Sequence, residues 1–200
     1  AKTLHLPKTN KVVNWKDFAK SAIETREQSQ WVMDGSELLK KFFNSLDENF
    51  FKQQAEIRKR VRLILLAEAS LEIQRLLEAL FKEAIILSEK TSLPLNELLH
   101  VLNEKNFEFY VIGGQIDEMT QTVTLIRGNL ESIVIPFSVF HPSGNGIKPD
   151  FSKFSIEDYG QTLKFGEYEA SVDSILYEFD PIYRREKRKE LITKDRSFGA

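Results

Sequence analysis

Residues 106–127, NFEFYVIGGQIDEMTQTVTLIR, are the stretch in which apolar residues change from helical spacing to alternation. Phe107, Phe109 and Val111 alternate with other side chains, residues 113–119 contain turn-forming glycines, and residues 120–128 return as a second alternating run. Alternation with a period of two is typical of half-buried strands, and two such runs around a turn predict a β-hairpin. We therefore expect the chain to change from helical to β-rich near residue 105.

The rest of the C-terminal half continues this β pattern. ESIVIPF at residues 131–137 predicts a third strand, and Pro136 places the end of that strand at a sheet edge or beyond the ladder. HPSGNGIKPD at 141–150 has the composition of a loop, DYGQTLKFGEYEAS at 158–171 predicts a turn, a strand, a turn and a strand, and Ser171 can cap a short helix that ends near residue 179. The expected core of this domain consists of Phe109, Val111, Val123, Leu125, Ile133, Ile135, Leu163 and Phe165.

Upstream of residue 105 the sequence predicts helices. Residues 14–33 have apolar side chains at helical spacing, and residues 46–90 contain no Gly or Pro, which predicts one very long helix or two helices with a bend. Asp34 with Glu37, and Ser45 with Glu48, have the spacing of capping boxes, and SLPLNELLHVLNEKN at 92–106 predicts a short helix. The apolar stripe of the long segment is too wide for a two-stranded coiled coil and favours bundle packing. The stripe consists of Phe50, Ile57, Val61, Ile64, Leu65, Leu71, Leu76, Leu80, Phe81 and Leu87.

These patterns together predict an α+β fold with three parts. Residues 1–104 form a helical domain that pairs protomers, residues 105–180 form a small, mostly antiparallel β-rich domain, and residues 181–200 form a basic helical linker. We expect a homo-oligomer on this basis.

Composition limits the classes of function. The 28 Lys and Arg residues against 30 Asp and Glu give a formal charge of -2, which argues against coating of a polyanion by the whole surface. The chain has no cysteine, which excludes disulfides, thiolate zinc sites and cysteine nucleophiles and favours a reducing, cytoplasmic location. No segment has the apolar length of a signal peptide core or of a membrane span, so we expect no membrane association.

Catalytic signatures are weak throughout the sequence. His5, His100 and His141 have no metal-ligand spacing. We therefore expect neither a metal nor a cofactor, and no enzyme. One enzymatic alternative stays open, in which acidic residues line a cleft of the small sheet, although such acids more often form a solvated rim. These acids are Glu157, Asp158, Glu167 and Glu169.

The last twenty residues carry the strongest local charge. Asp180 followed by Pro181 is a good N-cap and first-turn pair, so DPIYRREKRKELITK at 180–194 predicts a helix. Cations on such a helix can contact DNA phosphates without reading sequence. The candidate phosphate contacts are Arg184, Arg185, Lys187, Arg188 and Lys189.

Residues from about 106 to 200, above all GEYEASVDSILYEFDP at 166–181, resemble a group of bacterial proteins of unknown function. In that group a small β-rich domain precedes a Cro/repressor-type (XRE-like) helix-turn-helix, and the residues matching SFGA at 197–200 open the first DNA-binding helix. The resemblance does not extend to the N-terminal helices. It implies a transcription regulator, but the helix-turn-helix itself is missing here, so none of its recognition residues has a counterpart.

We therefore expect the N-terminal assembly and sensing part of a bacterial DNA-binding regulator, truncated before its helix-turn-helix, which would contact DNA through that missing C-terminal domain. One alternative is a stand-alone protein-interaction module, an antitoxin or scaffold with a protein partner. Another is a winged helix within residues 71–126, with helices at 71–90 and 93–104 before the hairpin. Its recognition helix would have one Lys, two Glu and no Arg, a poor set of donors for bases or phosphates.

Overall fold

The computed structural model describes residues 29–197. They belong to two compact units. The first unit contains the residues up to Lys90 together with Pro94–Asn103, and the second unit contains Thr91–Leu93 and the residues from Glu104 onward. Most of the predicted helix at 14–33 lies outside the described residues, as do His5 and the segment 198–200.

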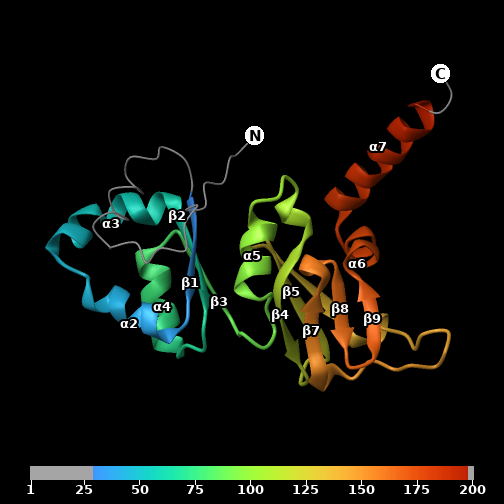
Figure 1. The fold of residues 1–200 in the computed structure, drawn as a ribbon, viewed down its shortest axis with the longest axis horizontal. Helices are drawn as coiled ribbons and strands as arrows, with labels where there is room; N and C mark the ends of the chain where they lie inside the picture. Colours follow the sequence, from blue (N-terminus) through green and yellow to red (C-terminus); the bar gives the residue numbers. More distant parts are fainter. Residues whose placement is uncertain (1–28, 198–200) are drawn as a thin grey trace. The chain divides into compact units, whose positions relative to one another are not determined.

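The first unit contains a three-stranded parallel sheet in the order β1-β2-β3. Two helices connect β1 to β2 and one connects β2 to β3, and in Figure 1 these three helices lie on one side of the sheet, as right-handed crossovers to successive strands require. A further helix, α5, follows the sheet in sequence. The elements are β1 (Ser29–Asp34), α2 (Ser36–Asn44), α3 (Glu48–Arg60), β2 (Val61–Leu66), α4 (Leu71–Leu80), β3 (Glu83–Leu87) and α5 (Leu95–Leu102).

The core of the first unit joins the helices to one face of this sheet. Phe42 of α2 is central, because its ring lies 6.0 Å from that of Phe50 in α3 and 5.7 Å from that of Phe81. Leu63 and Leu65 of β2 belong to the same core. The alternate residues of β2, Ile64 and Leu66, point to the opposite face and are also buried. The central strand is therefore covered on both faces.

The predicted helical bundle is wrong, because the first described element is a strand and the supposed long helix contains β2 and β3. The physical reason is the burial of β2 on both faces, which replaces alternation with an almost continuous apolar run. Such a run cannot be distinguished from a buried helical segment by periodicity alone. Two members of the predicted apolar stripe, Leu71 and Leu76, are in fact exposed.

The two predicted capping boxes are also wrong. Asp34 ends β1, and the N-cap position of α2 is Gly35, whose φ of 81° lies in the region that favours glycine. Ser45 ends α2 instead of opening the next helix. The true cap of α3 is Asp47, whose side chain accepts a hydrogen bond of 2.9 Å from the backbone N–H of Phe50.

The second unit contains two antiparallel sheets, ordered β4-β5-β6 and β7-β8-β9. Residues 91–93 run beside β4, since Leu93 N–H donates to Ile112 and Gly114 N–H donates to Thr91. Two helices follow β9, and α7 extends away from both sheets (Figure 1). The elements are β4 (Val111–Asp117), β5 (Thr122–Arg127), β6 (Ser132–Pro136), β7 (Phe154–Glu157), β8 (Thr162–Phe165), β9 (Tyr168–Ser171), α6 (Val172–Phe179) and α7 (Pro181–Ser197).

Here the prediction of an antiparallel, β-rich region is confirmed, with local corrections. Residues 107–109 form a 3-10 turn, and β4 continues through the predicted turn, so the hairpin turns at 118–121. Position 114 lies inside β4 and favours glycine, because an added Cβ would lie 2.8 Å from the Phe154 ring. Strand β7 was not predicted. Six of the eight predicted core residues are buried, and Phe109 and Ile133 are partly exposed.

Candidate functional site

The helix α7 carries all five predicted phosphate contacts, so the way in which it is attached to the second unit decides what those cations can do. Asp180 lies between α6 and α7 in an extended conformation. Its Oδ1 accepts hydrogen bonds from the backbone N–H groups of Ile182 at 2.7 Å and Tyr183 at 3.1 Å. The predicted N-cap is therefore confirmed, and Pro181 begins the helix with a φ that suits its first turn.

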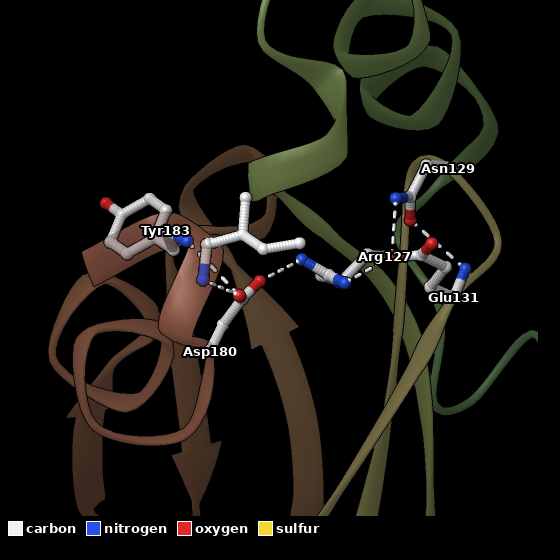
Figure 2. A network of polar contacts seen from close by, with 6 residues as sticks. Arg127, Asn129, Glu131, Asp180 and Tyr183 are labelled. Atoms are coloured by element: carbon white, nitrogen blue, oxygen red, sulfur yellow. Dashed lines mark hydrogen bonds and ion pairs between the residues drawn. The ribbon is translucent and has the colours of Figure 1, made fainter. Parts of the chain in front are cut away.

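The other carboxylate oxygen of Asp180 forms a buried ion pair. Nη1 of Arg127, at the end of β5, lies 2.6 Å from Oδ2 of Asp180, and the two side chains are 9% and 8% exposed (Figure 2). Buried charges are tolerated when they are paired and their remaining polar atoms are hydrogen-bonded. Asp180 meets this condition because it also caps α7, which ties the start of the helix to the β4-β5-β6 sheet.

The turn after β5 holds the guanidinium of Arg127 in position. Nη2 of Arg127 lies 2.6 Å from Oε2 of Glu131, which also accepts a hydrogen bond from Nδ2 of Asn129 (Figure 2). The backbone closes the same turn, because Leu130 N–H donates to Arg127 and Arg127 N–H donates to Glu131. Contacts within the turn therefore orient Arg127 independently of α7, and the sheet supplies a fixed partner for Asp180.

Tyr183 is a second attachment of α7. It is 4% exposed, its ring contacts that of Phe109 edge to face at 4.8 Å, and its hydroxyl donates to Oδ1 of Asp173 in α6. Burial raises the pKa of Tyr183 to about 12, and the hydrogen bond to Asp173 contributes to the increase. The same hydrogen bond is the main cause of a lowered pKa of Asp173.

Lys187 belongs to this attachment as well. Its Nζ lies 3.1 Å from Oδ1 of Asp173 and 5.3 Å from the centre of the Tyr183 ring. Interaction with Tyr183, followed by that with Asp173, raises the pKa of Lys187. Lys187 therefore has a role within the unit that the sequence did not predict.

Arg184 closes the end of α6. Its Nε donates to the carbonyl oxygen of Tyr177 at 2.6 Å, its Nη2 donates to that of Glu178, and its guanidinium lies 5.7 Å from the centre of the Tyr177 ring. The last carbonyls of a helix lack intrahelical partners, and a cation there complements the helix dipole. With Asp180 and Tyr183, Arg184 makes a third attachment. We call Arg127, Asp173, Asp180, Tyr183 and Arg184 the α6–α7 junction.

The five predicted cations therefore separate into two groups. Arg184 and Lys187 are half-buried and serve the junction, whereas Arg185, Arg188 and Lys189 are exposed. At about 100° per residue, these three residues fall within an arc of about 100° on α7. Arg188 also donates from Nε to the hydroxyl of Tyr177 at 3.3 Å. The outward cationic face of the helix, defined as Arg185, Arg188 and Lys189, is smaller than the sequence predicted.

The four acids of the enzymatic alternative lie at the β7-β8-β9 sheet and its turns, and all are exposed. Lys164 lies between two of them, 3.4 Å from Glu157 and 3.9 Å from Glu169, and Asp158 accepts a hydrogen bond from the hydroxyl of Thr162. Within residues 29–197, no group of three or more His, Cys, Asp or Glu side chains could hold a metal ion. These contacts suit a solvated, ion-paired rim.

Two further sequence expectations concern other parts of the chain. The winged-helix alternative assumed a helix over 71–90, but that range divides into α4 and β3. Among the described residues, no helix is both long enough and apolar enough to cross a membrane.

Most of the junction had no signal in the sequence. The Asp-Pro pair identified the cap of α7, whereas Arg127 precedes its partner Asp180 by 53 residues. Comparison of the chain with protein-family models, curated proteins and solved structures finds no match. The resemblance to regulators with an XRE-like helix-turn-helix accordingly stays a prediction.

Proposed function

We propose that this chain is the assembly and sensing part of a DNA-binding transcription regulator, in which the junction fixes the direction of α7 and so positions a DNA-reading domain beyond it. The observation that carries this proposal is the buried Arg127–Asp180 pair, because Asp180 both caps α7 and binds the sheet. A helix that served only as a flexible, soluble tail would not need a buried ion pair at its N-cap. The identity of the reading domain comes from the sequence resemblance alone.

The outward cationic face is assigned the role of phosphate contact. Arg185 and Lys189 lie one helical turn apart, and Arg185 lies between Arg188 and Lys189 around the helix. Such contacts increase affinity for DNA of any sequence and make binding salt-dependent, while base contacts by the reading domain supply specificity.

Paired protomers would suit an operator with paired half-sites. Self-association is part of the proposal, and light scattering at micromolar concentration should show a dimer or larger species.

The test uses the product of the complete gene and two DNA duplexes of equal length and unrelated sequence. In the α7 variant, Arg185, Arg188 and Lys189 are all replaced by Gln. In the control variant, the exposed Lys40, Lys52 and Lys59 of the first unit are replaced by Gln, so that both proteins lose three positive charges. Fluorescence anisotropy across a range of salt concentrations then measures affinity and its salt dependence.

The α7 variant should bind both duplexes more weakly by the same factor. The slope of log affinity against log salt should become shallower by about 0.9 for each DNA phosphate that the helix no longer neutralises. The control should keep the slope of the unmodified protein. An unchanged slope in the α7 variant, or an equal decrease of affinity in both variants, contradicts the phosphate role.

A protein-interaction module is the second candidate, because apolar side chains are exposed on the same two helices. Tyr177 is 37% exposed, Ile182 57%, Leu191 59% and Ile192 55%. Exposed aromatic and aliphatic side chains next to arginine are typical of protein contacts. Loss of self-association on Leu191→Ser and Ile192→Ser substitution, in a protein that binds neither DNA duplex, would favour this function.

A further inference from the structure

The chain contains two sulfur atoms that an oxidant can attack, and they differ in how far the fold exposes them to solvent. The sequence has two methionines and no cysteine. Met33, in β1, packs against the core of the first unit. Met119, between β4 and β5 of the second unit, is 97% exposed. The thioether of Met119 is therefore open to solvent, whereas that of Met33 is partly covered by packed side chains.

The hairpin turn keeps Met119 exposed. Oδ1 of Asp117 accepts hydrogen bonds from the backbone N–H groups of Met119 at 2.9 Å and Thr120 at 3.1 Å. Across the turn, Nε2 of Gln121 donates to the carbonyl oxygen of Glu118 at 2.7 Å. These contacts join a side chain on each side of the turn to the turn's backbone, and the Met119 side chain between them is exposed.

We propose that Met119 is a site of reversible oxidation by peroxides, a property that does not depend on the proposed DNA-binding function. In the forward step the thioether sulfur attacks one oxygen of hydrogen peroxide, the O–O bond breaks, and methionine sulfoxide and water form; sulfur loses two electrons and the peroxide is reduced. In the reverse step two thiols of a methionine sulfoxide reductase supply two electrons, and the products are the thioether, a disulfide and water. An exposed turn is accessible to both the oxidant and the reductase.

The test uses the unmodified chain and the variants Met119→Leu and Met33→Leu, each treated with hydrogen peroxide at neutral pH. Intact mass spectrometry follows the gain of one oxygen atom, and peptide mapping assigns it. The unmodified chain and Met33→Leu should gain their first oxygen at the same rate, at Met119. Met119→Leu should gain it several-fold more slowly, at Met33.

The reverse step needs methionine sulfoxide reductases of both epimer specificities, with a thiol reductant, because oxidation creates two epimers at sulfur. They should remove the oxygen from Met119 while the protein remains folded. Oxidation of Met33 at the same rate as Met119 would overturn the proposal, because it would mean that exposure does not select the site. Failure of the reductases on the folded protein, together with success on the denatured protein, would overturn the reversibility.

Discussion

The central strands of the parallel β1-β2-β3 sheet and the antiparallel β4-β5-β6 sheet, β2 in the first unit and β5 in the second, are both well covered, but they differ in how burial follows the sequence. Every residue of β2 from Leu63 to Leu66 is buried, because the parallel sheet is covered on both faces. In β5 the buried residues alternate with partly exposed ones. A strand covered on both faces loses the period-two pattern that identifies a strand, and this explains why only β5 was predicted.

The same two strands each carry an arginine in an ion pair, and the two ion pairs differ in how deeply they are buried. Arg62 of β2 pairs with Glu83 of the neighbouring β3 at 3.2 Å, and these side chains are 27% and 39% exposed. Arg127 of β5 pairs with Asp180 in a nearly dry environment. A partly hydrated pair contributes little to stability, whereas removing one partner of a buried pair leaves an uncompensated charge. The two arginines should therefore respond very differently to substitution.

Replacement of Arg127 by Met gives the largest expected effect. The carboxylate of Asp180 would stay buried without its cation, so the free energy of unfolding of the second unit should fall by about 3–5 kcal/mol. Hydrogen exchange of the backbone amides at 182–190 should accelerate as α7 loosens. Chemical denaturation and exchange monitored by mass spectrometry measure the two effects.

Arg62→Met is the matched control, since it removes the same side chain from the other central strand. Its expected cost is at most about 1 kcal/mol because the pair is partly hydrated. Equal costs for the two substitutions would show that the contrast between the two arginines has no energetic basis.

The presence or absence of alternation in each strand also determines how much of the fold could be predicted from the sequence. The hairpin, Pro136 at the end of β6, the pair β8 and β9, and the helices α6 and α7 follow from local pattern and turn chemistry, and the structure confirms them. The parallel sheet could not be recognised, because VRLILL at 61–66 carries no alternation and its partners lie tens of residues away. Strand β7 was also missed. It has four residues, too few to establish a period, and unlike β8, which lies between Gly160 and Gly166, it has no glycine turn on each side.

Truncation of one core leucine in each unit gives the next largest effect. Leu63 of β2 and Leu125 of β5 are both fully buried, so Leu→Ala at either position should cost about 2–5 kcal/mol, the sum of lost burial and a residual cavity. Hydrogen exchange should locate the damage: Leu63→Ala accelerates exchange in β1–β3, and Leu125→Ala accelerates it in β4–β6.

Two exposed positions serve as controls for these truncations. Leu71 in the first unit is 61% exposed and Val134 in the second is 56% exposed, so their replacement by Ala should change stability little. If either core truncation accelerated exchange equally in both units, the chain would unfold as one cooperative body, and the comparison between two separate units would fail.

The candidate site was predictable only in its local part. Asp180 followed by Pro181 identified the helix cap, because capping acts within three residues. The side chains that hold α7 to the unit come from β5, α6 and α7 itself, and Arg127, Asp173 and Tyr183 have nothing in their sequence neighbourhood that marks them as partners. The sequence therefore located the cations but could not distinguish Lys187, which serves the junction, from the exposed Arg185.

The smallest expected effect comes from Tyr183→Phe, which keeps the packing on Phe109 and removes the hydrogen bond to Asp173. At pH 7 the variant should lose about 1 kcal/mol of unfolding free energy, the usual net contribution of one hydrogen bond. The pH dependence gives the sharper test. The pKa of Tyr183 is raised to about 12, so its contribution should be complete below the ordinary tyrosine value near 10 and disappear as pH rises through about 12.

At the acidic end the sign is reversed, because the pKa of Asp173 is lowered in the folded protein. Its contribution is complete above the ordinary aspartate value near 3.9 and disappears as pH falls through the lowered value. The stability difference between the unmodified protein and Tyr183→Phe should therefore be greatest at intermediate pH and shrink at both extremes. Tyr177→Phe, which removes only an exposed hydroxyl and its 3.3 Å hydrogen bond from Arg188, is the control and should show neither change. A difference that stayed constant from acid to alkaline pH would mean that packing alone, without the bond to Asp173, holds Tyr183 in place, and the junction would then depend on the buried ion pair of Arg127.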